Sequence, residues 1–230
     1  METVKKGSKG GAVKTLQTKL GVKADGIFGD ATHKAVILYQ KGHGLTPDGV
    51  VGPRTWEALG YPSTTPRHID EIIVHCSANK EGKEVTSAQI SAVHKARHFS
   101  TYTRNGKTEY IGYHYLIHLD GSIEACRPIS KAGVHASGHN TRSIGICYIG
   151  GLDARDTDGT MIKDTRTPAQ KASLIKLIKE LVVKYPTIKK IMGHRDTSPD
   201  LNGDGIISPF EFIKGCPCFD AIPEYQSLLK

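Results

Sequence analysis

Two kinds of metal ligand stand side by side in one stretch of the chain, GHRDTSPDLNGDGIISPFEFIKGCPCFD, residues 193–220. His194 and the two cysteines of CPC offer the nitrogen and sulfur atoms that zinc prefers. Between them, residues 200–211 carry oxygen ligands at the spacing of a calcium-binding loop. The stretch therefore supports two hypotheses, a zinc site built from its ends and a calcium site in its middle.

A second histidine, His75, would complete the zinc set. It follows the apolar run EIIV, and polar side chains at the ends of buried strands are where α/β folds build sites. A histidine at a strand end is more often only hydrogen-bonded, so neither His75 nor His194 is strong evidence alone. With one CPC cysteine they make three protein ligands and leave zinc's fourth position open, which is the catalytic arrangement. Cys216 and Cys218 are separated by one proline, and each is within reach of such a site.

The calcium hypothesis rests on a complete set of ligand positions in residues 200–211. Pro199 directly precedes the loop, so the helix that leads into the loop of a calcium sensor is missing. The alternative is an acidic turn that binds nothing. In loop order the candidate ligands are Asp200, Asn202 and Asp204, then the Ile206 carbonyl, Ser208 and the bidentate Glu211, with Gly205 forming the sharp turn.

The elements that must position these ligands alternate between strands and helices from residue 68 onward. Apolar runs predict buried strands at 71–78 and 143–151 and a strand that ends at His194. Residues 112–129 are expected to form a hairpin turned at Asp120-Gly121. Helical patterns cover 86–99 and 167–186, the latter capped by Thr167. The predicted fold class is α/β, a mixed sheet flanked by helices.

The first part of the chain contains an internal repeat. DGIFGDAT at 25–32 and DGVVGPRT at 48–55 share D-G-x-x-G-x-x-T at an offset of 23 residues (48 minus 25). Each copy supplies a turn and then a helical pattern, and a further helix is expected before Gly21. We expect a small all-α, three-helix domain at 1–60, a proline-containing linker at 61–67, and a second domain at 68–230 that holds the 200–211 insert.

Charge and composition narrow the class of protein. The formal net charge of +8 favours anionic partners, but the basic residues are scattered and no nucleic-acid-binding motif organises them, so no nucleic acid is expected. No stretch reaches the ~20 apolar residues of a membrane span, and the N-terminus lacks an apolar signal segment. Five cysteines without disulfide spacing suit a reducing compartment. We expect a monomer made in the cytoplasm without a signal peptide.

Several of these motifs together resemble known families. KKGSKGGAVKTLQTKLG, ADGIFGDATHKAVILYQKGHGL and PDGVVGPRTWEAL resemble the peptidoglycan-binding domain found beside many wall hydrolases. In the second domain, VHCSA, GYHYLI, NTRSIGI, TPAQ, GHRD and KGCPCFD follow one another in the order of the type 2 N-acetylmuramoyl-L-alanine amidases, which they resemble. These are phage lysozyme-like zinc enzymes related to peptidoglycan recognition proteins. The 200–211 insert departs from the pattern, because the close phage relatives have a short loop there.

The resemblance implies zinc held by His75, His194 and Cys216, together with Tyr113 and Lys214. Zinc lowers the pKa of a bound water to about 7 and polarises a carbonyl, which suits amide hydrolysis. Tyr113 would orient the water or steady the oxyanion, and Lys214 would donate to that oxyanion. Cys216 is preferred over Cys218 because Cys-Pro-x-Phe-Asp matches the family there. Without the resemblance, Tyr113 would be interpreted as a core hydroxyl and Lys214 as a solvated lysine.

Weaker candidates for substrate contact lie in two places. Tyr113 and His114 should face opposite sides of a strand, so only one of them is expected in the site. The glycine-rich loop AGVHASGHN is placed to touch substrate. The candidates are His135, His139 and Asn140 in that loop and Tyr39 and Trp56 in the small domain, where core packing is the preferred interpretation of the two aromatics.

The expected function is zinc-dependent hydrolysis of the amide bond between N-acetylmuramic acid and L-alanine in bacterial peptidoglycan. The resemblance implies a phage or prophage endolysin that acts at the cell wall after release, with calcium bracing the segment that delivers Lys214 and Cys216. Two alternatives stay open. One is a non-catalytic peptidoglycan recognition protein, and the other is a zinc peptidase that cuts within the stem peptide.

Overall fold

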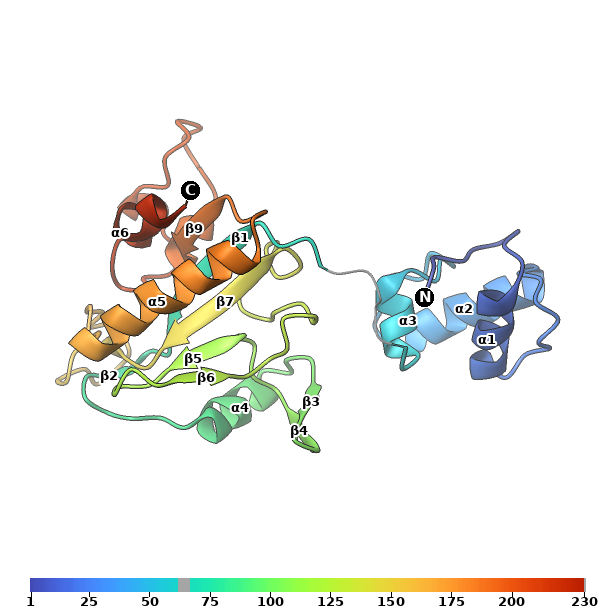
Figure 1. The fold of residues 1–230 in the computed structure, drawn as a ribbon, viewed down its shortest axis with the longest axis horizontal. Coiled ribbons are helices and arrows are strands. Elements are labelled where there is room, and N and C mark those ends of the chain that lie inside the picture. The colour runs from blue at the N-terminus through green and yellow to red at the C-terminus, as the bar shows by residue number, and fades with distance from the viewer. Residues whose placement is uncertain (62–66, 230) are drawn as a thin grey trace. The chain divides into compact units, whose positions relative to one another are not determined.

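The computed structural model describes residues 1–61 and 67–229 and divides into two compact units, Met1–Pro66 and Arg67–Lys230 (Figure 1). The linker expected at 61–67 falls mainly on residues 62–66, which lie outside the described residues. Arg67, the last residue of that expected linker, belongs to the second unit. Its guanidinium donates hydrogen bonds to the carbonyls of Ile129 (2.6 Å) and Ser143 (2.8 Å).

The first unit is a three-helix module, as the sequence predicts. Its helices are α1 (Gly11–Leu20), α2 (Asp30–Gly42) and α3 (Pro53–Ala58). α1 ends at Gly21, whose left-handed backbone (φ 68°) is the geometry that glycine adopts without strain. The helices and their connecting turns enclose one apolar core, to which Val13, Leu16, Phe28, Val36, Val51 and Trp56 contribute fully buried side chains.

The internal repeat is also a repeat of hydrogen bonds, centred on a buried glutamine. Gln17 Nε2 donates to Asp25 Oδ1 (2.9 Å), the Ile27 carbonyl (3.0 Å) and Thr32 Oγ1 (3.0 Å). Its Oε1 accepts from the Gly26 N–H (2.8 Å). One side chain thereby holds the D-G-x-x-G turn closed and fixes the start of the next helix.

The second copy reproduces every bond with each residue number raised by 23. Gln40 Nε2 donates to Asp48 Oδ1 (3.0 Å), the Val50 carbonyl (3.0 Å) and Thr55 Oγ1 (3.2 Å), and its Oε1 accepts from the Gly49 N–H (2.9 Å). Both glutamines are 1% exposed. Because a buried amide that loses its partners leaves those partners unsatisfied, each turn depends on its glutamine.

The second unit is built on a five-stranded sheet with strand order β6-β5-β7-β1-β9. Strands β5, β7, β1 and β9 run parallel, and β6 pairs antiparallel with β5. The predicted mixed sheet is therefore confirmed, including the hairpin at Asp120-Gly121. The strands are β1 (Glu71–Cys76), β5 (Tyr115–Ile117), β6 (Ile123–Ala125), β7 (Ser143–Tyr148) and β9 (Lys190–Gly193).

Helices cover both faces of this sheet (Figure 1). α5 (Pro168–Lys184) lies across one face and α4 (Ser87–Ala96) packs on the other, while the short α6 (Ala221–Tyr225) lies beside β9. Side chains alternate along a strand, so Ile72 and Val74 of β1 pack with α5. Ile73 packs on the opposite face, and His75 shares its side of the strand. The alternation thus directs His75 away from the main core.

The two longest helices of the second unit, α4 and α5, each begin at a capping threonine, and the cap at Thr167 is the one that the sequence predicts. The Thr86 and Thr167 hydroxyls accept hydrogen bonds from the backbone N–H groups of Gln89 and Gln170. In turn, Oε1 of each glutamine accepts a hydrogen bond from the backbone N–H of its threonine. The remaining elements are short. They are the parallel pair β2 (Asn79–Lys80) and β8 (Gly151–Leu152), the antiparallel pair β3 (Tyr102–Arg104) and β4 (Lys107–Glu109), and the 3₁₀ turns η1 (His194–Thr197), η2 (Pro209–Glu211) and η3 (Gln226–Leu228).

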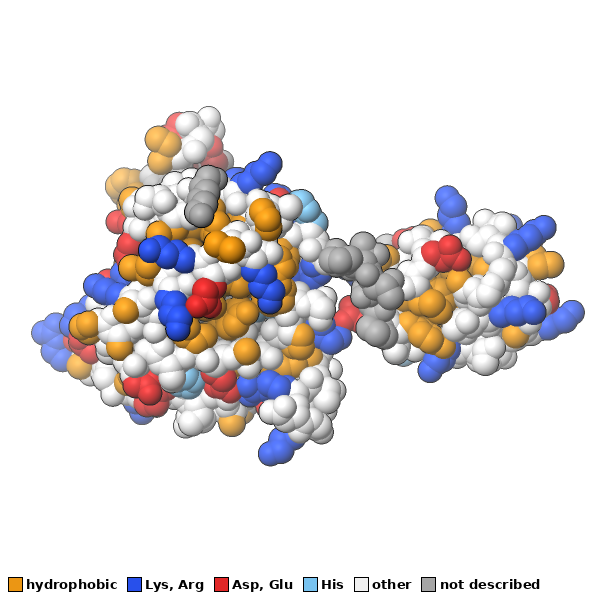
Figure 2. All heavy atoms as spheres, viewed as in Figure 1, with side chains coloured by type: hydrophobic (Ala, Val, Ile, Leu, Met, Phe, Trp, Pro, Cys, Tyr) orange, Lys and Arg blue, Asp and Glu red, His pale blue; other side chains and the backbone are white. Residues whose placement is uncertain are grey.

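Charged side chains are dispersed over the visible face of each unit (Figure 2). Lysines and arginines do not gather into a single patch there, as the scattered basic sequence predicts. Over residues 1–61 and 67–229, none of the helices combines the length and the apolar character that crossing a membrane requires.

Replacing Gln40 by leucine is expected to destabilise the first unit by about 2–4 kcal/mol, because the Gly49 N–H, Asp48 and Thr55 each lose a buried partner. Trp56 is the single tryptophan of the chain and lies in this unit's core, so its fluorescence during urea unfolding reports on this unit alone. The exposed neighbour Lys41→Ala serves as the control. A Gln40→Leu transition at the wild-type urea midpoint would contradict the expectation.

Candidate metal centre and groove

Two parallel strands bring the predicted histidines together. β1 and β9 are neighbours, with Val74 opposite Gly193, and His75 and His194 are the next residues along the two strand directions. The centroids of their rings lie 4.6 Å apart. His75 is buried, whereas His194 is partly exposed at the wall of a groove. The carboxyl ends of adjacent parallel strands thus create the meeting point that the sequence predicts.

Cys216 joins them from the loop that follows the insert. Its Sγ lies 3.8 Å from Nδ1 of His75 and accepts a hydrogen bond from the Cys76 N–H (3.2 Å). The ligand atoms of His75, His194 and Cys216 all lie within 4.8 Å of one another. Among the described residues, these three side chains form the group of His, Cys, Asp or Glu residues whose ligand atoms lie close enough together to hold a metal ion.

The loop that carries Cys216 is held by its neighbours on three sides. A Cβ at Gly193 would come within 2.4 Å of Pro217 Cδ, so glycine before His194 is needed for the loop to approach the strand end. The Tyr148 hydroxyl donates to the Pro217 carbonyl (2.7 Å), and the Arg195 N–H donates to the Cys216 carbonyl (2.7 Å). The cysteine is therefore positioned by β7 and η1 as well as by its own chain.

Cys218, the rival ligand, points to a different place. Its Sγ lies 3.6 Å from Sγ of Cys76 and 3.2 Å from the Gly151 carbonyl, to which it donates. A Cβ at Gly151 would meet the Cys76 sulfur at 2.6 Å, so glycine there leaves room for the two thiols. The geometry groups Cys216, and not Cys218, with the histidines.

The histidines of the centre are uncharged near neutral pH. Burial, and then the positive charge of Lys214, lower the pKa of His194 to about 4. Burial and the neighbouring His135 and His194 hold the pKa of His75 well below its ordinary value. Each imidazole therefore keeps a lone pair available for a metal ion.

A groove of about 570 Å³ opens over the centre, and Tyr113 and Lys214 both line it with His194 and Cys216. The ring of Tyr113 lies 5.1 Å from that of His75, between centroids. Burial raises the pKa of Tyr113 well above its ordinary value, so its phenol remains protonated and can donate a hydrogen bond. The sequence motifs thus place both residues in one cavity with two of the candidate metal ligands.

His114 faces away from the groove, as the alternation of strand residues predicts. Its Nδ1 accepts from the Gly145 N–H (2.9 Å), and its Nε2 lies 3.1 Å from the Lys131 carbonyl and 3.1 Å from Arg67 Nη1. Burial lowers the pKa of His114 to about 3. His114 directly precedes β5, and its ring bonds to β7 and to the loop that follows β6, so its role is structural.

The loop residues proposed as substrate contacts have other partners. His139 Nδ1 bonds to the buried carboxylate of Glu71 (2.8 Å), and Asn140 Oδ1 accepts from the N–H groups of His135 and Ala136 (2.8 and 3.0 Å). His135 and Asn140 line a second part of the groove, whereas His139 does not. His135 also bonds to the ring of His75, a role that the spacing of the sequence does not reveal.

The two aromatic candidates of the first unit differ in exposure. Trp56 has no exposed surface, and its Nε1 donates to the Glu2 carbonyl (2.7 Å), so substrate contact by Trp56 is wrong and core packing accounts for it. Tyr39 is partly exposed and stacks on His43 with ring centroids 3.9 Å apart. Substrate contact by Tyr39 stays a prediction.

In the insert, residues 200–211, the acidic side chains bind the loop's own backbone. Asp200 accepts from the N–H groups of Gly203 and Gly205 (2.7 and 2.8 Å), and Glu211 accepts from those of Leu201 (2.8 Å) and Ser208 (2.7 Å). Asp200, Asp204 and Glu211 are not among the described side chains that converge as a metal-binding group. Glu211, which is buried, therefore closes the loop through hydrogen bonds to its backbone.

Two family models match the chain in succession. The peptidoglycan binding domain model matches residues 9–59, and the N-acetylmuramoyl-L-alanine amidase model matches residues 65–204. The second match covers more than half of the chain, and the fold and site agree with it. The chain belongs to the N-acetylmuramoyl-L-alanine amidase family.

The chain is also similar to individual proteins. An uncharacterised protein of Haemophilus influenzae is 47% identical over 102 residues, which cover 44% of this chain and 84% of that one. The endolysin of Klebsiella phage KP32 is 33% identical over 157 residues, covering 68% of this chain and 85% of that one. Among solved structures, the amidase LysC from Clostridium intestinale is 26% identical, with coverage of 73% and 91% and a TM-score of 0.49.

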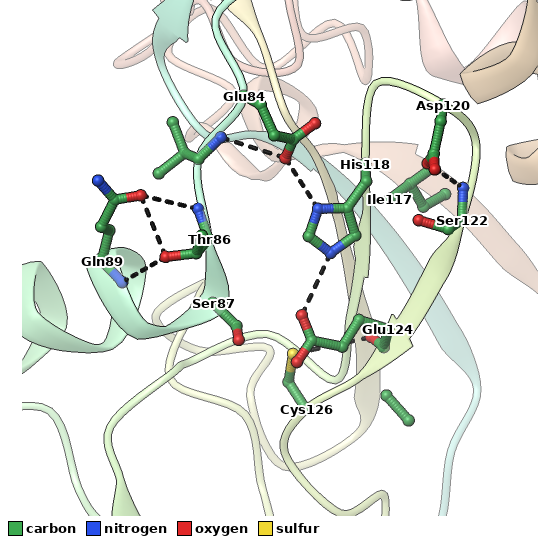
Figure 3. Close-up of polar contacts among 12 residues, drawn as sticks. Glu84, Thr86, Ser87, Gln89, Ile117, His118, Asp120, Ser122, Glu124 and Cys126 are labelled. Carbon is green, nitrogen blue, oxygen red and sulfur yellow. Dashed lines mark hydrogen bonds and ion pairs between the residues drawn. The ribbon is translucent and has the colours of Figure 1, made fainter.

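A cluster of charged side chains outside the metal centre stabilises one wall of the groove (Figure 3). The segment before α4 lines the groove with Glu84, and His118 bridges Glu84 (2.8 Å) to Glu124 of β6 (3.2 Å). Arg104 pairs with Glu124 on its other side (2.6 Å), and Asp120 lies in the adjoining turn. Burial alone would lower the pKa of His118, but its hydrogen bonds to the two glutamates outweigh burial and raise it.

The raised pKa of His118 predicts a pH-dependent contribution to the stability of the second unit. The contribution is fully present below the unfolded pKa of about 6.5 and is lost as pH rises through the higher folded pKa. His118→Gln should therefore lose up to about 1 kcal/mol relative to wild type at pH 6 and less at pH 8. Urea unfolding followed by circular dichroism measures this difference. A loss that grows with pH would contradict the assignment.

Proposed function

We propose that the protein is a zinc-dependent N-acetylmuramoyl-L-alanine amidase that acts on bacterial peptidoglycan, as a phage or prophage endolysin. The observation that carries the proposal is the convergence of His75, His194 and Cys216 beside a groove that His194 and Cys216 line. Two uncharged imidazoles and a thiol suit zinc and leave a fourth position for the reaction. The family match and the endolysin relative support the amide bond between N-acetylmuramic acid and L-alanine as the substrate.

The chain's own residues have separable tasks in this reaction. When bound, zinc would supply Lewis-acid activation of the scissile carbonyl and of water. The protonated phenol of Tyr113 donates a hydrogen bond within the groove and orients the reacting groups. The Lys214 ammonium, on the same groove, stabilises the negative charge that develops on the carbonyl oxygen. The walls formed by the segment before α4 and the 134–140 loop confine the peptide.

The first unit is proposed to bind the wall and raise the local concentration of the second unit there. The site of action would be the bacterial cell wall, reached after release from the cell in which the protein is made. The protein is proposed to work as a monomer, because the second unit holds all three ligands, Tyr113 and Lys214 within one chain.

The matched variants Cys216→Ser and Cys218→Ser test the proposal. We expect wild type and Cys218→Ser to carry about one zinc each and to release peptides with an L-alanine N-terminus from purified peptidoglycan. Cys216→Ser should lose zinc and more than about 100-fold in peptide release, because a ligand is removed. Zinc is quantified by elemental analysis and the peptides are sequenced by mass spectrometry.

Each alternative function predicts a different result. Peptides cut inside the stem would identify a peptidase, and wall binding without zinc or peptide release would identify a recognition protein. Loss of zinc in Cys218→Ser, with zinc retained in Cys216→Ser, would show that Cys218 is the ligand and Cys216 is not.

Calcium binding at residues 200–211 is a separate proposal, supported by the full set of oxygen ligands and by the Asp200–Gly205 hydrogen bond that closes the turn. Calcium would add to the bracing that Glu211 provides three residues before Lys214. Saturating calcium at 100 times its dissociation constant should stabilise wild type by about 2.7 kcal/mol and leave Glu211→Gln nearly unchanged. An unchanged wild-type Tm would reject calcium as a ligand.

A further inference from the structure

His135 lies directly behind His75, on the side away from Cys216. Nδ1 of His75 faces Sγ of Cys216 at 3.8 Å, and Nε2 of His75 lies 3.0 Å from Nδ1 of His135. The two rings meet edge to face, with centroids 4.9 Å apart. A metal ligand has only one ring nitrogen free for the metal, and the partner of the other nitrogen decides which one that is.

We propose that His135 is a positioning residue that keeps the His75 proton on Nε2 and thereby presents Nδ1 to the metal. This inference rests on the proposed function, because it assigns His135 a task toward the zinc ligand. It replaces the substrate contact expected from the sequence with a contact to the metal centre. His135 acts through His75 and needs no bond to the substrate.

The hydrogen bonds around the two rings are consistent with one direction of donation. If Nε2 of His75 donates to Nδ1 of His135, the proton of His135 stands on its own Nε2, which lies 3.4 Å from Ser143 Oγ. The Ser143 hydroxyl donates to the His139 carbonyl (2.8 Å), so its lone pairs are free to accept from His135. The opposite direction would leave Nε2 of His135 without a donor, because the Ser143 proton is already used.

The ring of His135 packs closely against the backbone of two glycines. A Cβ at Gly133 or Gly145 would come within 2.2 or 2.6 Å of the ring's Cδ2, so only glycine fits at either position. The backbone at His135 is fixed as well, because its N–H and that of Ala136 donate to the Asn140 side chain. Gly145 lies on β7 beside β1, and the sheet therefore sets the distance between the two imidazoles.

The matched pair His135→Asn and His135→Leu tests the proposal. Asparagine can place Oδ1 where Nδ1 stands and keep the acceptor, whereas leucine has the same branching without an acceptor. We expect His135→Leu to weaken zinc binding by about 10–100-fold in competition with a chromophoric chelator, and His135→Asn to recover most of that loss. Thermal unfolding of the metal-free variants controls for stability.

A second readout needs neither metal nor activity. Long-range ¹H–¹⁵N NMR spectra of the metal-free protein should show His75 as the Nε2–H tautomer in wild type and in His135→Asn, and a mixture of tautomers in His135→Leu. Equal zinc affinity in wild type and His135→Leu, equal losses in both variants, or an Nδ1–H tautomer in wild type would each overturn the proposal.

The proposed function and the proposed role of His135 would fail in distinguishable ways. If wild type binds no zinc and releases no peptide, the proposed function fails, whatever the tautomer of His75. If wild type binds zinc and releases peptides while His135→Leu keeps wild-type zinc affinity, the proposed function stands and only the positioning role of His135 is lost.

Discussion

The parallel pairing of β1 with β9 is the constraint on which the site depends. It sets Val74 opposite Gly193, and the two histidines that follow therefore leave the sheet at the same edge. The alternation of side chains along β1 directs His75 away from the core under α5. A shift of one residue in either strand would point one imidazole into the core and separate the two histidines. The strand pairing therefore positions both candidate ligands without a contribution from a metal ion.

The third ligand depends on contacts that strand pairing does not provide. The Cys216 loop rests on Gly193, is bonded by the Tyr148 hydroxyl, and reaches the centre after an insert closed by Glu211. These contacts hold Cys216 beside the histidines although residues 200–211 separate it from His194 in the sequence. The insert projects from the fold (Figure 1), while the residues on either side of it stay tied to the sheet. Its own carboxylates bond to its own backbone and compete with no ligand of the centre.

Much of this arrangement could be predicted from the sequence, because periodicity and caps are local signals. The buried runs at β1 and β7, the hairpin at Asp120-Gly121 and the cap at Thr167 all form as predicted. The repeat at 25–32 and 48–55 predicts the first unit, although the glutamines that organise it act over eight to fifteen residues and are visible only in the structure.

The residues whose partners the sequence does not reveal are those whose contacts are distant along the chain. Arg67 was assigned to a linker, yet it bonds to carbonyls more than 60 residues away. His135 and His139 share a glycine-rich loop, but one turns to His75 and the other to Glu71. In each case tertiary contacts, which no local pattern encodes, decide the role.

The central claim is that His75, His194 and Cys216 hold one zinc ion beside the groove. The most direct measurement is anomalous diffraction at the zinc edge from crystals of the full chain grown with zinc. The account predicts one strong peak bounded by the two imidazoles and the Cys216 sulfur. A peak at the Cys76–Cys218 pair or in the 200–211 loop, with none at the three ligands, would contradict it.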